Sequence, residues 1–262
     1  MNSLIDSHCH IDFPDFDIDR HSLLSECRSR GMSAILVPGV SANQWQQMAN
    51  VVRDYSDDRV YPRLLPAYGM HPCFMSQHDS VDLNTLELRL SEGALAVGEI
   101  GLDAFHGDEL IEAQLTLFKA QLSIAKGNAL PVVIHSRKTQ DLVLKCVRQL
   151  QFKEGGILHA FSGSLQQAQL AVDLGFKIGF GGAATYERAN RIKRILKTLP
   201  REAVVFETDS PDIPPSFDRG NRNTPLNLFR IVEILAQVRD EPIDELLASS
   251  TQNVLEILKL AD

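Results

Sequence analysis

Two histidines, His8 and His10, lie one residue apart directly after a short apolar run near the start of the chain. Because side chains alternate between the two faces of a strand, these imidazoles point the same way if the run is a strand. Two adjacent imidazoles make half of a divalent-metal site, although an isolated His-x-His is also found as a surface pair or as packing. The pair therefore raises a metal-binding hypothesis that needs further ligands from elsewhere in the chain.

Residues of metal-ligand type follow four later apolar runs. They are Glu99, His135, His159 and Asp209. If polar residues merely began loops at these places, Ser, Asn, Gly and Lys should occur there as often as His and carboxylates. One ion uses three or four protein ligands, so six candidates predict two divalent cations. The first cation is expected on His8, His10 and Asp209 and the second on His135 and His159, with Glu99 bridging them.

The types of the candidate ligands limit which metals can bind and which reaction they can support. Imidazole and carboxylate suit Zn or Mn, and Mg at weaker affinity, so the element stays open. A pair of divalent cations lowers the pKa of a water molecule, polarises the bond under attack and neutralises the leaving oxygen, which indicates hydrolysis. Asp209 is expected to hold the water and to accept its proton as general base, and Glu99 to take part through its bridging position.

The elements that must position these residues are eight short apolar runs, each followed by a polar or Gly-rich break. The runs are 4–5, 34–37, 64–68, 94–97, 131–134, 156–158, 176–180 and 203–206. Short runs without alternation are typical of strands buried on both faces of a parallel sheet, and the intervals leave room for a crossover helix each time. The pattern predicts an α/β fold, a (β/α)8 TIM barrel, as one domain over residues 1–262, with a doubly wound sheet as the alternative.

Apolar residues at helical spacing predict helices between these runs. The expected buried faces are Ile111, Leu115, Phe118 and Leu122; Leu142, Cys146 and Leu150; and Ile192, Ile195 and Leu199. After the last run, Thr224-Pro225 is interpreted as an N-cap followed by proline at the first helical position. That helix should bury Leu228, Ile231, Val232 and Leu235, and a final helix is expected from about Ile243 to Leu260.

Composition limits the function classes. The chain has 262 residues, with 44% hydrophobic and 23% charged, which is ordinary for a globular protein. The formal net charge of -8 argues against a protein that coats nucleic acid, so any phosphate contact must be local. The four cysteines contain no C-x-x-C pair and are interpreted as reduced thiols. No signal peptide or membrane span is expected, and we predict a cytoplasmic protein without an obligate protein partner.

Several motifs resemble those of the TatD family of metal-dependent deoxyribonucleases. They are residues 4–12, 131–141 and 207–211, with shorter matches at 69–72, 98–103, 159–164 and 220–223. The resemblance runs from residue 4 to the C-terminal helices. It implies a (β/α)8 barrel of the amidohydrolase type with two divalent cations, a 3′-to-5′ exonuclease-like activity on DNA, and a ligand set that falls on the six residues named above.

The chain departs from this pattern in one place. The family commonly has an aromatic residue after the aspartate of the strand-four motif, where Ala104 follows Asp103 in this sequence. This change is expected to alter the wall of the substrate pocket. The chain also resembles the branch of the family whose members are described only as metal-dependent hydrolases, so its deoxyribonuclease activity is implied by relatives.

A phosphodiester substrate needs cations and proton donors near the metals. Arg137 shares the strand direction of His135, and His71 ends the third run in Gly-Met-His-Pro, where it can contact a phosphate or protonate a leaving oxygen. Arg222, in the loop after the eighth run, is the third candidate for substrate binding. For each residue a structural hydrogen bond is the alternative. Asp103 is expected to orient a ligand histidine or to serve as a turn carboxylate.

Further charged and aromatic residues near the predicted rim have the same two interpretations. A basic group (Arg188, Arg191, Lys193 and Arg194) can contact phosphates, although charge runs on helices are usually solvated faces. Aromatic residues such as Phe105 can stack on bases, although most rim aromatics serve packing.

Two other function classes remain open. One is an amidohydrolase-like enzyme that cuts an ester or C–N bond in a small metabolite or an aminoacyl ester. Many such enzymes bridge their metals with a carboxylated lysine on strand four, whereas Glu99 occupies that place here and favours the nuclease-like subgroup. The other is a non-catalytic binding barrel, which should have lost at least one ligand, and none is missing.

Overall fold

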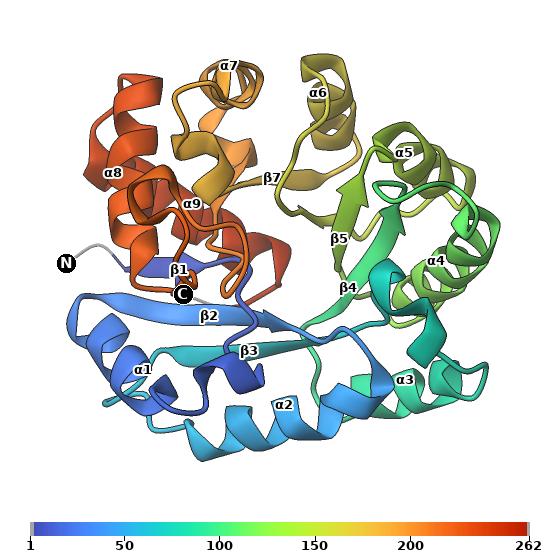
Figure 1. The fold of residues 1–262 in the computed structure, drawn as a ribbon. Coiled ribbons are helices and arrows are strands. Elements are labelled where there is room, and N and C mark those ends of the chain that lie inside the picture. The colour runs from blue at the N-terminus through green and yellow to red at the C-terminus, as the bar shows by residue number, and fades with distance from the viewer. Residues whose placement is uncertain (1–2, 261–262) are drawn as a thin grey trace.

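The computed structural model describes residues 3–260, and its centre is a barrel of eight parallel strands (Figure 1). The strands are β1 (Leu4–Asp6), β2 (Met32–Pro38), β3 (Arg63–Tyr68), β4 (Ala96–Asp103), β5 (Val132–Arg137), β6 (Gly156–Leu158), β7 (Phe176–Phe180) and β8 (Val204–Phe206). Each strand pairs with the next one along the chain, so the spatial order equals the sequence order. The predicted (β/α)8 barrel is confirmed, because a doubly wound sheet would reverse its strand order in the middle.

Helices follow the strands and cover the outside of the barrel (Figure 1). They are α1 (Arg20–Ser29), α2 (Ala42–Asp54), α3 (Asp82–Ser91), α4 (Ile111–Gly127), α5 (Gln140–Gln149), α6 (Leu165–Asp173), α7 (Asn190–Thr198), α8 (Asn227–Arg239) and α9 (Ile243–Ile257). In the part of the chain described, no helix is both long and apolar enough to cross a membrane.

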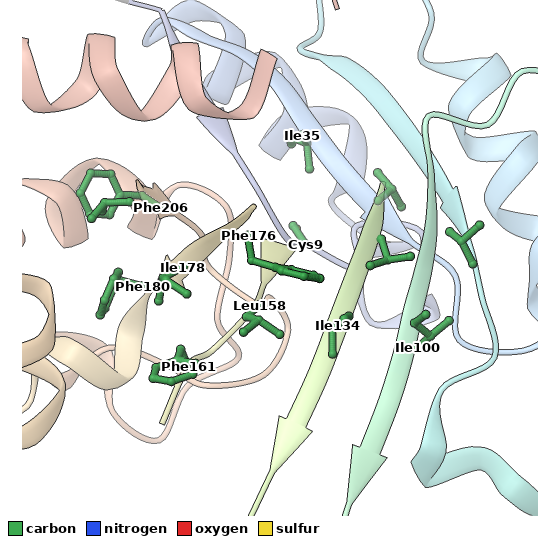
Figure 2. Packing of buried hydrophobic residues seen from close by; sticks show 14 of the residues in the cluster. Cys9, Ile35, Ile100, Ile134, Leu158, Phe161, Phe176, Ile178, Phe180 and Phe206 are labelled. Atoms are coloured by element: carbon green, nitrogen blue, oxygen red, sulfur yellow. The ribbon is translucent and has the colours of Figure 1, made fainter. Parts of the chain in front are cut away.

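Apolar side chains pack in two layers. The larger one lies between the strands and the outer helices, where Ile100 of β4 pairs with Ile134 of β5 and Phe180 of β7 pairs with Phe206 of β8 (Figure 2). The smaller one fills the barrel interior and joins strand residues such as Val133 to Val254 of α9. Both layers are close to fully buried, so the strands are apolar on both faces, as the sequence pattern predicts.

The alternation of side chains explains where the polar centre begins. Val133 and Ile157 point into the barrel interior as members of the inner apolar cluster. His135 lies two residues after Val133, and His159 lies two residues after Ile157. Because strand side chains alternate, both histidines point to the same side as these apolar residues. The imidazoles therefore form the next layer above the apolar interior, at the carboxyl end of the barrel where active sites of this fold are found.

The barrel closes between its first and last strands through the segments that follow them. Cys9 and Ser210 form a parallel bridge beyond the ends of β1 and β8. The Ser7 amide donates to the Phe206 carbonyl oxygen over 3.0 Å. This seam joins segments from the two ends of the chain.

Four expectations from the sequence about these elements need correction. Strand β4 begins at Ala96 and runs to Asp103, so Glu99 lies inside the strand rather than after its end. Helix α8 begins at Asn227 with Leu226 at the N-cap position, because Thr224 and Pro225 form a turn whose carbonyl oxygens accept from Asn227 and Leu228. The interpretation of Thr224-Pro225 as a cap was therefore wrong.

The buried face of α5 also differs from the one expected. Val143, Cys146 and Val147 are buried, whereas Leu142 and Leu150 are only half-buried. Gln140 at the N-terminus of this helix is also buried, and its side-chain amide donates to the Ser136 carbonyl oxygen and the Ser162 hydroxyl. The last helix ends at Ile257, three residues before the expected Leu260.

Candidate metal centre

The closing seam of the barrel positions the first group of metal ligands. The Asp209 amide donates to the His8 carbonyl oxygen, and the His10 amide donates to the Ser210 carbonyl oxygen, each over 2.8 Å. These bonds set His8, His10 and Asp209 side by side, with 3.3 Å between the two Nε2 atoms and 3.4 Å from His8 Nε2 to Asp209 Oδ1. All three residues are buried.

Asp6 ties the two sides of this seam together. Its Oδ1 accepts from the backbone amides of Thr208 and His8, and its Oδ2 accepts from the Thr208 hydroxyl over 2.7 Å. Burial raises the pKa of Asp6 to about 7 against the lowering effect of these hydrogen bonds. The carboxylate thus connects the residue that precedes Asp209 to the residue that begins the His8–His10 pair.

Asp209 has a backbone conformation that ordinary residues seldom adopt. Its φ is 58°, in the left-handed region. This conformation is energetically unfavourable for residues that have a Cβ atom. The seam hydrogen bonds from Asp209 to His8 and from His10 to Ser210 hold the backbone on both sides of it. The conformation turns the carboxylate toward His8 and His10.

Glu99 lies between two groups of imidazoles and presents one oxygen to each. Its Oε2 is 3.1 Å from His8 Nε2 and 3.4 Å from His10 Nε2. Its Oε1 is 2.8 Å from His159 Nε2 and 3.3 Å from His135 Nδ1. The side chain is 2% exposed, so this carboxylate cannot be solvated by bulk water. Neighbouring imidazoles hold its pKa well below the usual range, although burial alone would raise it.

His135 and His159 form the second group with Glu99 Oε1. The His135 Nδ1 and His159 Nε2 atoms are 3.2 Å apart. Gly101 of β4 makes this arrangement possible, because a Cβ at its position would lie 2.0 Å from the His135 carbonyl oxygen. Its φ of 146° is also one that glycine favours. The glycine therefore lets β4 approach β5 beside the ligand.

Two further carboxylates touch the histidines of this second group. Asp103 Oδ2 is 2.8 Å from His135 Nε2, and the Phe105 amide donates to Asp103 Oδ1 over 2.7 Å. These bonds lower the pKa of Asp103 to about 2, although burial raises it. Glu207 Oε1 accepts from the Ala160 amide and lies 3.8 Å from His159 Nδ1. Burial raises the pKa of Glu207 to about 8.

The spacing of the donor atoms tests whether cations fit. Metal–ligand bonds of about 2.0–2.2 Å place neighbouring donors of one ion about 3–3.5 Å apart. Donor pairs within the two groups lie between 2.8 Å, for His159 and Glu99, and 3.7 Å, for His10 and Asp209. The groups His8–His10–Asp209 and His8–Glu99–His159 are each compact enough to hold a metal ion. The donor sets fit divalent cations.

Charge in the centre is shared unevenly among the imidazoles. Burial lowers the pKa of His8 well below its usual range. Burial acts in the same direction on His10 and His159, but Glu99 and Asp209 overcome it and raise their pKa values to about 9 and about 10. Without a cation, the carboxylates therefore hold protons on two of the ligand nitrogens.

The ligands open into a cavity of about 560 Å³ at the carboxyl end of the barrel. Its wall includes ligand residues together with Phe13, Phe74, Arg137 and Ile213. This volume lies in the range of small-ligand sites. A cavity of this size accepts a single nucleotide or a small metabolite rather than a folded partner.

The three residues predicted to bind substrate have different positions. His71 lines the cavity, with Nε2 3.2 Å from Glu99 Oε1, and burial lowers its pKa to about 4. Arg137 also lines the cavity and lies over the Phe105 ring at 3.4 Å. Arg222 is not part of the cavity wall. It pairs with Asp19 over 2.5 Å and covers the Phe16 ring, which fixes the loop after β8 against the loop before α1.

Asp6 and Glu207 were given no role from the sequence. Asp6 is the last residue of β1, Glu207 directly follows β8, and both are buried. A carboxylate at the end of an apolar run must be hydrogen-bonded or charge-paired when it faces inward, and this signal could have identified both. Asp103, by contrast, contacts His135. This is the first of its two expected roles, the orientation of a ligand histidine.

Comparisons with known proteins agree with this geometry. The profile of the family described as TatD related DNase matches residues 5–259. An uncharacterised metal-dependent hydrolase of Escherichia coli, YjjV, is 37% identical over 252 residues, which cover 95% of each chain. The crystal structure of this TatD homologue superposes with a TM-score of 0.92 at 36% identity and covers 98% of both chains. A human protein named deoxyribonuclease TATDN3 is 29% identical and covers 97% of this chain and 94% of its own.

Proposed function

The chain belongs to the family of TatD-related DNases and is a metal-dependent hydrolase, and on that premise we propose that it removes nucleotides from DNA ends by hydrolysing phosphodiester bonds. The observation that supports a two-cation centre is the position of Glu99. Its Oε2 faces His8 and His10, whereas its Oε1 faces His135 and His159. A carboxylate that presents one oxygen to each of two donor groups is suited to bridge two cations.

The six residues divide into two ligand sets in this proposal. His8, His10 and Asp209 would hold one divalent cation, His135 and His159 would hold the other, and Glu99 would contribute to both sites. Zn, Mn and Mg all remain compatible with imidazole and carboxylate donors. When bound, such a pair supplies a water of lowered pKa and positive charge at the bond under attack.

The chain's own residues orient the reactants and move protons. Asp209 accepts the proton of the attacking water at its carboxylate, which lies beside His8 and His10 in the wall of the cavity. His71 faces the same cavity beside Glu99 and is placed to contact the scissile phosphate or the leaving oxygen. Arg137, at the cavity edge, contributes positive charge toward a phosphate.

The human relative's name, deoxyribonuclease, supports DNA as the substrate. The cavity volume supports the processing of ends, because about 560 Å³ accepts a terminal nucleotide but not a continuous duplex. We therefore expect stepwise release of mononucleotides from a 3′ end.

A label-release assay tests this proposal. Protein reconstituted with Zn, Mn or Mg is incubated with single- and double-stranded DNA labelled at the 3′ or the 5′ end, beside a panel of esters and amides. Early release of a 3′-labelled mononucleotide supports the proposal. Turnover of an ester or amide without release of nucleotides contradicts it and favours an amidohydrolase-like reaction at the same centre.

A further inference from the structure

A second, smaller pocket of about 380 Å³ adjoins the metal cavity beyond the end of β5. Its lining includes Phe105, Lys138 and Arg191, together with Arg137 and Ser162. Arg137 and Ser162 also line the metal cavity, so the two pockets meet along these residues. A ligand longer than one nucleotide that leaves the metal cavity on this side would enter the smaller pocket.

Three cations line this pocket and are available to a ligand. Arg137, Lys138 and Arg191 are exposed, and none of them forms an ion pair with any residue between 3 and 260. Arg222, which lies outside both pockets, pairs with Asp19 instead. Three unpaired cations together are notable in a protein with a formal net charge of -8. They give this place a local positive potential toward anions.

The pocket also has an exposed aromatic ring. Phe105 is 43% exposed, whereas the other phenylalanines between residues 3 and 260 are buried or half-buried. The Arg137 guanidinium lies 3.4 Å from its ring centroid and the Lys138 ammonium lies 5.0 Å from it. An exposed ring beside cations in a groove is the combination that binds single-stranded nucleic acid, because bases stack on the ring while phosphates contact the cations.

The position of Arg191 is fixed by the loop that follows β6. Its guanidinium donates to the Ser162 carbonyl oxygen over 2.7 Å, which uses one of its five N–H groups. Ser162 borders the metal cavity, so this hydrogen bond holds the positive charge at the junction of the two pockets. An arginine that served only as a solvated helix residue would not need this anchor at the cavity edge.

We propose that this smaller pocket binds the nucleotide next to the terminal one of a single strand. The terminal nucleotide occupies the metal cavity, a phosphate further along the strand contacts Lys138 and Arg191, and a base stacks on Phe105. This inference rests on the proposed function, because it takes the metal cavity as the place of the terminal nucleotide. If the pocket binds this nucleotide, the affinity for a strand increases once the strand is long enough to reach the pocket.

Binding of thymidylates of one, three and six nucleotides tests this inference, because the shortest of them fills only the metal cavity. The strands have a 5′ fluorescein and phosphorothioate links, which slow hydrolysis, and fluorescence anisotropy gives Kd for metal-loaded protein. In the unaltered protein, Kd should fall as the strand lengthens. In the Lys138→Gln/Arg191→Gln variant this gain is lost, with about tenfold weaker binding of the hexamer. The slope of log affinity against log salt should shrink by about 0.7, since the variant loses its contact with one phosphate of the single strand.

Phe105→Ala tests the stacking contact separately. Loss of one base–aromatic stack weakens binding of the hexamer about tenfold, whereas Phe105→Trp keeps it. Arg63→Gln/Lys153→Gln is the matched control. It removes the same two charges from exposed positions at the opposite end of the barrel, where β3 begins and where the chain leads from α5 into β6. This variant should keep the full dependence on strand length.

The outcomes separate this inference from the proposed function. If the Lys138→Gln/Arg191→Gln variant binds the hexamer as tightly as the matched control, or if the protein binds no strand at all, the inference is wrong. Release of mononucleotides in that case leaves the proposed function intact. If binding depends on Lys138 and Arg191 but no metal-loaded form of the protein releases nucleotides, the proposed binding pocket is supported and the proposed activity is wrong.

Discussion

Asp103 Oδ2 lies 2.8 Å from Nε2 of His135, which leaves Nδ1 of the same ring 3.3 Å from Glu99 Oε1. The carboxylate therefore determines which imidazole nitrogen faces the centre. A carboxylate on the outer nitrogen of a ligand histidine fixes the tautomer and the ring orientation and raises the basicity of the ligand. Asp103 is itself held by the Phe105 amide, so a loop connects the second ligand group to the smaller pocket.

Removal of the Asp103–His135 contact should weaken cation binding. Asp103→Ala should weaken the binding of one of the two cations by about 10–100-fold, because His135 loses its orienting partner. Asp103→Asn keeps an oxygen that accepts from Nε2 and should have a smaller effect. Competition with a chelator of known affinity measures both. Equal cation affinities in Asp103→Ala and the unaltered protein would show that His135 needs no support or is not a ligand.

Asp6 predicts a matching effect on the first ligand group. Asp6→Ala removes the acceptor of Thr208 and His8 and frees the seam that places Asp209, so cation affinity should fall about 10–100-fold. Asp6→Asn is the matched variant, since its amide keeps one oxygen acceptor and can reorient toward the Thr208 hydroxyl. The same chelator competition, with far-ultraviolet circular dichroism to check the fold, distinguishes lost positioning from unfolding. An unchanged affinity in a folded Asp6→Ala protein contradicts this role.

The pKa values of His10 and His159 predict that cation binding releases protons. In chelator-treated protein these values are about 9 and about 10, so at pH 7 both imidazoles hold a proton that a metal must displace. Cation affinity should therefore increase steeply as pH rises from 7 to about 9 and less steeply from there to about 10, where the second imidazole also loses its proton. Titration calorimetry at pH 7 in two buffers of different ionisation enthalpy measures the number released. A heat that is the same in both buffers would contradict the assigned protonation.

Gly101 predicts a stability effect beside the centre. A Cβ there would meet the His135 carbonyl oxygen, so Gly101→Ala should lower the free energy of unfolding by about 2–3 kcal/mol. Gly127→Ala at the end of α4 is the matched control, because nothing lies within 4 Å of its Cβ position. That change should leave stability unaltered or raise it by up to about 1 kcal/mol. Urea unfolding compares the two, and equal midpoints would show that β4 and β5 separate without cost.

The sequence was informative about the fold because each strand is apolar on both faces. Short apolar runs at regular intervals have few arrangements other than a parallel barrel or a doubly wound sheet. Ligand histidines could be recognised because strand alternation repeats every two residues, as from Val133 to His135. The length of β4 could not be recognised, since Gly98, Glu99 and Gly101 interrupt its apolar pattern at the place where the carboxylate enters the centre.

Contacts between segments that are distant in the chain could not be predicted from the sequence pattern. Asp6 and Thr208 are 202 positions apart in the chain, and only the closed barrel brings them together. The same holds for Arg222, whose partner Asp19 precedes α1. Its position in the loop after the last strand made Arg222 a candidate for substrate binding, but its side chain pairs with Asp19 and is not part of the cavity wall. Charge alone cannot distinguish these two positions.

The central claim is that Glu99 joins two cation sites. Anomalous diffraction from crystals of Mn-loaded protein, with data collected at the Mn absorption edge, tests it most directly. We expect two peaks in the anomalous difference map, one among His8, His10 and Asp209 and one among His135 and His159, with a Glu99 oxygen facing each. A single peak, or peaks away from Glu99 in a fully loaded protein, would contradict it.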